Sequence, residues 1–273
     1  MSLLEGKVAF ITGAARGQGR SHAVRLAEEG ADIIAVDLCE QMPSVHYPLA
    51  TAEDLEETQA LVEKFDRRIV AMKADVRRPD QLQAAVDAGL ERFGRIDIVL
   101  ANAGIAPIAG PGGNENVELW RDVVDVNLTG VWNTVQAAIP AMISGGRGGS
   151  IVITSSTAGL KGIVYGTAGG TAYTTTKHGV VGMMRALANE LGPHSIRVNT
   201  VHPTGVNTKM LDNDYLRSFL SPKSERKSPM KNVLPVGVLE PGDISEVILW
   251  LVSDPAKYMT GVTLPVDAGF CIV

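Results

Sequence analysis

A tyrosine and a lysine lie one helical turn apart in the stretch "AYTTTKHG" at residues 172–179. On a helix, Tyr173 and Lys177 would share one face. A free tyrosine has a pKa of ~10, and lowering it to near neutrality requires ~4 kcal/mol of preference for the phenolate. A neighbouring ammonium in a partly dry cleft supplies much of that preference. An isolated pair of this kind is usually a solvated helix face, so the rest of the chain must decide whether Tyr173 can take a proton from an alcohol.

Small polar residues follow the predicted strands where such a cleft would form. The run "TSS" at 154–156 offers a hydroxyl donor for a substrate oxygen, from Ser155 or Ser156. "NAG" at 102–104 and "HPTG" at 202–205 end two other predicted strands. Ligands of open parallel sheets bind beyond the carboxyl ends of the strands, so these stretches are expected to meet there.

A glycine loop, "TGAARGQG" at 12–19, follows the first predicted strand and opens a predicted helix. Gly13, Gly17 and Gly19 would let the backbone turn tightly and approach a pyrophosphate, which the N–H groups of the helix N-terminus would bind. The GxxxGxG spacing differs from the commoner GxGxxG, and an ordinary strand–helix turn is the alternative. Asp37 ends the second predicted strand, where a carboxylate accepts hydrogen bonds from the adenosine ribose and repels a 2′-phosphate. Arg16 in the loop is a counter-signal, but Leu38 adds no second cation, and we therefore expect NAD rather than NADP.

Apolar strands and amphipathic helices alternate along the chain, which predicts an α/β fold. The strands lack a polar alternation, as is typical of strands buried on both faces. We predict one domain over residues 1–273, a doubly wound (Rossmann) parallel sheet of about seven strands with helices on both faces. The predicted strands are 7–13, 31–37, 68–75, 96–104, 149–156, 196–203 and 263–269, and the predicted helices are 17–29, 51–68, 79–93, 116–143, 172–191 and 241–253.

Two stretches interrupt this alternation. An insertion near 38–68 contains a candidate helix that Thr51 can cap, with Glu53 and Asp54 at its positive end. The stretch 207–235 is long and irregular, and loops of this length often bind substrate.

Composition excludes several classes of function. Hydrophobic residues make up 45% of the 273 residues, which predicts a packed core. The net charge is −5 and no block of Lys or Arg stands out, so we expect no nucleic-acid or anionic-membrane partner. No window of ~18 apolar residues predicts a spanning helix, and the strand pattern begins too early for a signal peptide. Cys39 and Cys271 form no metal motif, so we expect no metal site and a cytoplasmic location, although a disulfide between them is not excluded by sequence.

The chain resembles the short-chain dehydrogenase/reductase family over its full length. The motifs that carry the resemblance are "TGAARGQG", "DV" (75–76), "NAG", "VNLTG" (126–130), "SS" (155–156), "YTTTK" (173–177) and "RVNTVHPTGVNT" (197–208). It implies a catalytic set in which Ser156 polarises the substrate oxygen and Tyr173 is the acid/base. Lys177 would bind the nicotinamide ribose and lower the pKa of Tyr173, and Asn127 would hold a water that relays protons.

The resemblance also implies the cofactor site. Asp75 and Val76 would flank adenine, Asn102–Gly104 would line the ribose, and Val206 and Thr208 would contact the carboxamide and phosphates. The complete predicted set for NAD is Gly13, Arg16, Gly17, Gln18, Gly19, Asp37, Leu38, Asp75, Val76, Asn102, Ala103, Gly104, Tyr173, Lys177, Pro203, Val206 and Thr208.

The chain departs from the family pattern at the "ANAG" stretch, in a wider serine–tyrosine spacing, and in the insertion near 38–68. The insertion resembles a subgroup, the mycofactocin-associated enzymes typified by carveol dehydrogenase, through "VDLC", "TAEDLEET", "TSSTAGLKG", "KHGVVGMMR" and "HPTGVNTKM". This likeness implies a helix that covers the adenine end of a tightly held NAD, and hence an external redox acceptor for turnover.

Apolar side chains in 207–235 and in "IAPIAG" (105–110) predict a compact apolar secondary alcohol, such as a terpenoid, or its ketone as substrate. The same residues could instead pack the loop or face a neighbouring subunit. Two other functions remain open: a general reductase of steroid or acyl-carrier ketones, and a catalytically silent dinucleotide-binding sensor. The family resemblance implies a homotetramer, paired through the helices at 116–143 and 172–191.

Overall fold

The fold is built on one sheet of seven parallel strands. The structure, a computed structural model, describes residues 2–107, 117–163, 166–211 and 232–273. The strand order is β3-β2-β1-β4-β5-β6-β7. The chain adds β2 and β3 on one side of β1, then returns and adds β4 to β7 on the other side, as in a doubly wound fold. The strands are β1 Val8–Thr12, β2 Asp32–Asp37, β3 Ile69–Lys73, β4 Ile98–Ala101, β5 Gly149–Thr154, β6 Ile196–Pro203 and β7 Thr263–Val266. The predicted α/β fold and all seven predicted strands are confirmed.

The central strands are apolar on both faces because each face is covered by helices. In β1, Phe10 joins a core on one side of the sheet, and Ala9 and Ile11 join a second core on the other side. This follows from the alternation of side chains along a strand. The continuous apolar runs in the sequence therefore reflect two cores, one on each face.

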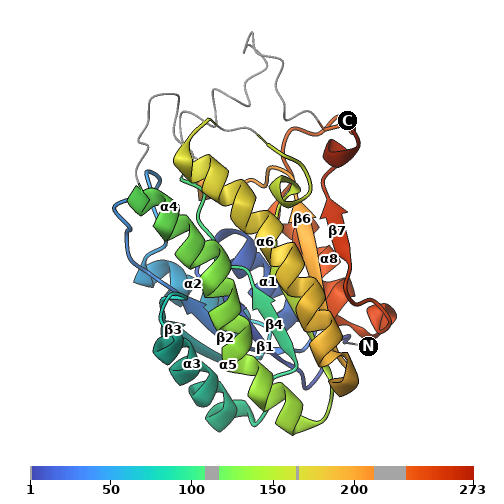
Figure 1. Ribbon diagram of the computed structural model, residues 1–273. Coiled ribbons are helices and arrows are strands. Elements are labelled where there is room, and N and C mark those ends of the chain that lie inside the picture. Colours follow the sequence, from blue (N-terminus) through green and yellow to red (C-terminus); the bar gives the residue numbers. More distant parts are fainter. Residues whose placement is uncertain (1, 108–116, 164–165, 212–231) are drawn as a thin grey trace.

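Helices cover the sheet in two layers (Figure 1). One layer packs over the core that contains Phe10, and the other over the core that contains Ile11. The first layer is α3 Pro79–Phe93, α4 Val117–Val124, α5 Gly130–Gly145 and α6 Ala168–Leu191, and the second is α1 Gly17–Glu28, α2 Ala52–Glu63 and α8 Pro241–Val252.

Three helices differ from their predicted bounds. Helix α2, predicted at 51–68, ends at Glu63. The helix predicted at 116–143 is interrupted by a π-helical turn, Asp125–Thr129, between α4 and α5. Asn127 lies in this turn and bonds to a neighbouring loop, which is a common reason for a local π turn at a functional site. Helix α6 begins before the predicted 172, because Thr167 caps it by accepting a hydrogen bond from Gly170 N.

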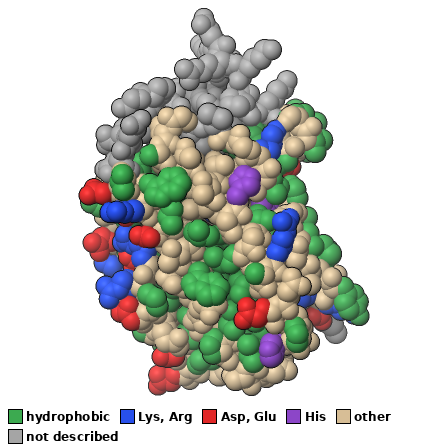
Figure 2. Space-filling model, in the orientation of Figure 1, with side chains coloured by type: hydrophobic (Ala, Val, Ile, Leu, Met, Phe, Trp, Pro, Cys, Tyr) green, Lys and Arg blue, Asp and Glu red, His purple; other side chains and the backbone are tan. Residues whose placement is uncertain are grey.

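Apolar side chains are exposed over α4 and α5, as Figure 2 shows. Trp120 and Trp132 are 37% and 44% exposed there. Within the described parts of the chain, no helix combines the length and apolar character that crossing a membrane requires.

We expect loss of the α2 cap to destabilise the protein. Thr51 accepts from Asp54 N at 3.3 Å, and the Asp54 carboxylate accepts from Thr51 N at 2.9 Å. Thr51→Ala should therefore lower the free energy of unfolding by about 1 kcal/mol, because one N–H of the first turn loses its acceptor. Urea denaturation measures the change. Thr51→Ser keeps the hydroxyl and should stay near wild type; equal loss in both variants would contradict a capping role.

Candidate active site

A cavity of about 630 Å³ opens at the carboxyl ends of β1, β2 and β4. A second cavity of about 80 Å³ lies next to it, and the two share Gln18, Thr208, Met210 and Leu211. The larger cavity is lined by most of the predicted cofactor residues: Gly13, Arg16, Gly17, Gln18, Gly19, Asp37, Leu38, Asp75, Val76, Asn102, Ala103, Gly104 and Thr208. Ser156, Tyr173, Pro203 and Val206 line the smaller one. Lys177 lines neither cavity and is bonded to the end of β5.

The glycine loop packs tightly against the neighbouring strand end. A Cβ on Gly19 would lie 1.9 Å from the carbonyl oxygen of Gly13, and a Cβ on Gly13 would lie 2.9 Å from Cα of Ala103. Asn102 reinforces this contact by donating its side-chain N–H to Thr12 O at 3.1 Å. At Arg16, which precedes α1, no side chain caps the helix, so the loop offers backbone N–H groups to an anion.

Asp37 ends β2 at the edge of the larger cavity. Its carboxylate accepts from Ala15 N at 3.0 Å and from Cys39 N at 3.4 Å, which fixes its orientation. Burial raises the pKa of Asp37, and these backbone hydrogen bonds oppose the increase. The acidic side chain therefore stands where the sequence predicted a ribose acceptor.

Two other loop residues bear on the fit of a dinucleotide. The Arg16 guanidinium donates to the carbonyl of Pro48, so it is turned toward the insertion. Gln18 has a buried Oε1 without a hydrogen-bond partner at the junction of the two cavities. A buried carbonyl of this kind needs a donor, and the ribose hydroxyls and carboxamide of a dinucleotide provide them. The residues present therefore fit such a cofactor.

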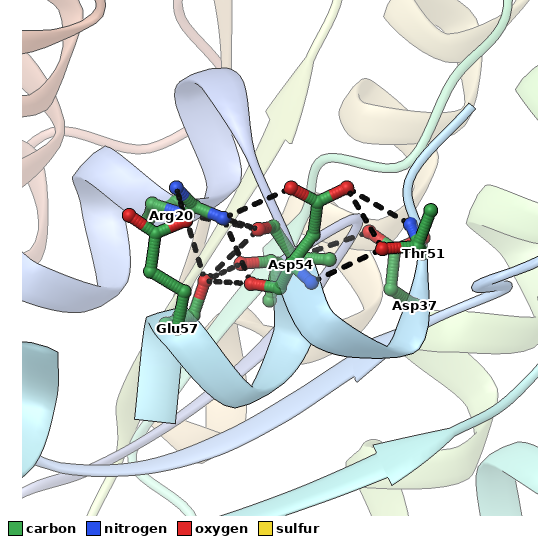
Figure 3. Close-up of polar contacts among 8 residues, drawn as sticks. Arg20, Asp37, Thr51, Asp54 and Glu57 are labelled. Atoms are coloured by element: carbon green, nitrogen blue, oxygen red, sulfur yellow. Dashed lines mark hydrogen bonds and ion pairs between the residues drawn. The ribbon is translucent and has the colours of Figure 1, made fainter. Parts of the chain in front are cut away.

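The insertion covers the same cavity. Its residues Met42, Tyr47, Leu49 and Ala50 line the cavity wall opposite the glycine loop, and the predicted site contained none of them. Figure 3 shows how α2 is held: Arg20 donates to Glu57 at 2.6 Å and to the Asp54 carbonyl at 2.8 Å. The sequence predicted the helix, but apolar loop residues carried no signal of this lining role.

Lys177 is 4% exposed and donates from Nζ to the carbonyl of Thr154 at 2.7 Å. Its Nζ lies 5.6 Å from the centroid of the Tyr173 ring. A Cβ on Gly104 would lie 3.4 Å from Oδ1 of Asn127 and 3.6 Å from the same Nζ, which are ordinary contact distances, so Gly104 lies directly beside both groups. Burial lowers the pKa of Lys177 to about 8.

Tyr173 is half-buried and hydrogen-bonded to the side chain of Ser156. Burial raises the pKa of Tyr173, and the Ser156 hydrogen bond opposes that increase. The net direction is set by desolvation, which disfavours the phenolate. The expectation that Lys177 lowers this pKa stays a prediction.

The structure distinguishes the two serines that the sequence alone left open. Ser155 is buried and donates to the carbonyl of Lys177 at 2.9 Å, so its hydroxyl fixes α6. Both serines line the smaller cavity, but Ser156 is the one hydrogen-bonded to the tyrosine. His202, which the predicted site did not include, donates from Nδ1 to the carbonyl of Ser156 at 2.8 Å. Burial lowers the pKa of His202 to about 4, so the ring is neutral and holds the backbone in place.

Asn127 is fully buried and both polar atoms of its side chain are occupied. Oδ1 accepts from Ile105 N at 2.8 Å, and Nδ2 donates to Ile105 O at 2.7 Å. The side chain therefore fixes the loop after β4, and its role in a proton relay stays a prediction.

An apolar wall faces the phenol. Ala106, which is buried, packs against Ile163, Met210, Leu211 and the Tyr173 ring. The predicted substrate stretches lie partly outside the described residues, at 108–110 and 212–231. Among the residues that are described, no cluster of His, Cys, Asp or Glu could hold a metal ion.

This arrangement defines a dinucleotide-binding protein with a buried Tyr–Lys–Ser group beside the cofactor cavity. Residues 13–271 match a family profile described as enoyl-(acyl carrier protein) reductase. An uncharacterised oxidoreductase of Mycobacterium tuberculosis is 57% identical, over 98% of this chain and 97% of the relative. The (−)-trans-carveol dehydrogenase of Rhodococcus erythropolis is 48% identical, over 98% of this chain and 99% of its own length.

A solved structure agrees with these relatives. Carveol dehydrogenase from Mycobacterium avium, in complex with NAD, superposes with a TM-score of 0.92 at 50% identity, covering 100% of both chains. The chain belongs to the short-chain dehydrogenase/reductase family.

The buried amine of Lys177 should make the free energy of unfolding depend on pH. Its pKa falls from 10.5 to about 8 on folding, so the unfolded chain binds more protons between these values and stability rises with pH in that window. Lys177→Met removes the charge that burial disfavours. The variant should therefore be more stable than wild type at about pH 7.5. This difference in the free energy of unfolding should shrink by about 2 kcal/mol by about pH 9.5, because wild type gains stability over that range. Urea denaturation at both values tests this; an advantage independent of pH would show that the amine is solvated.

Proposed function

We propose that the protein is an NAD-dependent alcohol dehydrogenase that interconverts a small apolar secondary alcohol, of the carveol type, and its ketone. The observation that carries this proposal is a hydrogen-bonded Tyr173–Ser156 pair, with the Lys177 amine 5.6 Å from the tyrosine ring, in a pocket that adjoins a dinucleotide-sized cavity. The carveol dehydrogenases at 48% and 50% identity support it over the full chain.

The residues divide the chemistry of oxidation as follows. Ser156 holds the substrate oxygen, and Tyr173 takes the hydroxyl proton as the C–H bond gives up its hydride and the C=O bond forms. NAD, when bound, accepts that hydride and brings a positive charge to the site. Lys177 keeps an ammonium beside the phenol. Because burial raises the pKa of Tyr173, the Ser156 hydrogen bond and nearby positive charge must together favour the phenolate.

NAD is favoured over NADP by the residues at the adenosine end. Asp37 is held in place by Ala15 and would accept from the ribose hydroxyls. Arg16, the cation that could pair with a 2′-phosphate, donates instead to the Pro48 carbonyl. The M. avium carveol dehydrogenase, which was crystallised with NAD, supports the same choice.

The substrate class follows from the smaller cavity. Ala106, Met210 and Leu211 line this cavity together with Tyr173, and Ile163 packs against Ala106. A compact hydrocarbon ring with one hydroxyl suits this wall better than an anionic substrate does. A reductase of steroid or acyl-carrier ketones is the alternative, and it would turn over rapidly with free cofactor.

We infer that cofactor exchange is slow and that an external redox acceptor, of the mycofactocin-linked kind, regenerates NAD. The insertion supports this inference because it lines the cofactor cavity with four residues, Met42, Tyr47, Leu49 and Ala50. We also propose a cytoplasmic homotetramer. Exposed Trp120 and Trp132 on α4 and α5 support an interface there, and the free thiols Cys39 and Cys271 suit a reducing compartment.

Addition of carveol to the NAD-loaded protein should produce the absorbance band of reduced nicotinamide. Tyr173→Phe should bind NAD equally but lower the rate of reduction at least about a hundredfold, since the proton acceptor is lost. Stopped-flow absorbance measures both. A bound dinucleotide whose spectrum never changes would favour the sensor, and fast turnover with free cofactor would favour the general reductase.

The two neighbouring serines provide a matched pair of variants. Ser156→Ala should lower kcat by about a hundredfold to a thousandfold, because a donor to the reacting oxygen is removed. Ser155→Ala should keep kcat within a few-fold and lower the free energy of unfolding by about 1 kcal/mol, since the Ser155 hydroxyl donates to the Lys177 carbonyl on α6. Steady-state kinetics and urea denaturation check the pair. The reverse pattern would assign the substrate contact to Ser155.

A further inference from the structure

The segment between β2 and α2 is a loop that is stabilised by hydrogen bonds between its own residues. We call residues 38–50 the cover loop. The carboxamide of Gln41 donates to Val45 O at 2.8 Å and accepts from Leu49 N at 2.9 Å. These two bonds bridge the loop internally, so it can present a side chain at a fixed position without belonging to a helix or strand.

Tyr47 is the side chain that the cover loop presents. It is 3% exposed and lines the cofactor cavity. Its hydroxyl accepts a hydrogen bond from Ala106 N at 3.0 Å. A buried phenol is stable only with a partner for its oxygen, so this contact fixes where the loop closes.

Ala106 belongs to the substrate pocket. It lines the smaller cavity together with Ser156 and Tyr173, and it packs against Met210. The preceding residue, Ile105, is held at both its N–H and its carbonyl by Asn127. The backbone of this wall is therefore fixed from two sides, by Asn127 from the helix layer and by Tyr47 from the cover loop.

The residue after Tyr47 is held by the glycine loop. The Arg16 guanidinium donates to Pro48 O, so two neighbouring residues of the cover loop are fixed by hydrogen bonds from two different segments. On either side of them, Met42 and Leu49 line the cofactor cavity. Moving the loop away from this cavity would break the bond between Tyr47 and Ala106.

We propose that Tyr47 is a positioning residue that couples cofactor retention to substrate binding, through one hydrogen bond between the cover loop and the wall of the alcohol pocket. This rests on the proposed function, since the wall must be the one that receives the alcohol. The coupling is reciprocal: alcohol on the wall favours the closed loop, and the closed loop fixes the wall.

Tyr47→Phe tests the proposal because it removes only the hydroxyl. Loss of about 1 kcal/mol from one hydrogen bond should raise the KM for carveol about fivefold and speed release of NAD about fivefold, with kcat unchanged. KM and kcat are measured with a dye acceptor in excess, and release is measured as loss of radiolabelled NAD from the loaded protein. Tyr258→Phe is the matched control, since that tyrosine is 89% exposed and should change neither value.

Gln41→Leu provides a second variant in case Tyr47→Phe perturbs the core. Gln41 is exposed, and its loss should loosen the cover loop and shift KM and NAD release in the same direction. If Tyr47→Phe folds normally and matches Tyr258→Phe in both measurements, the proposal is overturned. If wild type oxidises no carveol-type alcohol, the proposed function fails instead. A change in release with KM unchanged would also overturn the coupling.

Discussion

A buried cation beside a phenol is the constraint on which the site depends. Lys177 lies in the interior with its amine on the Thr154 carbonyl, and burial lowers its pKa to about 8. Its charge is therefore sensitive to surrounding dipoles, and the end of β5 has to be placed accurately. Gly104 lies directly beside both the amine and the Asn127 carboxamide, since a Cβ there would be in ordinary contact with each. The site consequently requires precise relative placement of helix α6, strand β5 and the loop after β4.

The parallel sheet brings these elements together. Carboxyl ends of adjacent strands lie at one edge, so the glycine loop after β1 and the polar ends of β4, β5 and β6 become neighbours. Asn102 ties two of these ends by donating to Thr12 O. His202 at the end of β6 holds the backbone of Ser156 from the next strand. The motifs are thus separated in sequence because each strand contributes one part, and the sheet order decides which parts touch.

Much of this arrangement could be predicted from sequence, because strand-end motifs and the glycine loop are local signals whose consequence follows from topology. The strands, the α2 cap at Thr51 and the cavity lining were predictable on that basis. The upward shift of the Tyr173 pKa could not be predicted, because it depends on burial and the spacing of residues in the sequence does not report burial. The π turn around Asn127 and the lining role of Tyr47 also required the structure, because each arises from a contact between residues distant in sequence.

Water exclusion links the cover loop to the chemistry. A dry site strengthens the attraction between an ammonium and a phenolate, but it also raises the pKa of the phenol by desolvation. The protein offsets the second effect locally through the Ser156 hydrogen bond, and the wall at Ala106 keeps the pocket apolar. At saturating alcohol the bound substrate favours the closed loop, so the site stays dry during proton transfer even when one loop contact is lost. The contact of Tyr47 with the substrate wall therefore matters most for binding the alcohol and retaining the cofactor.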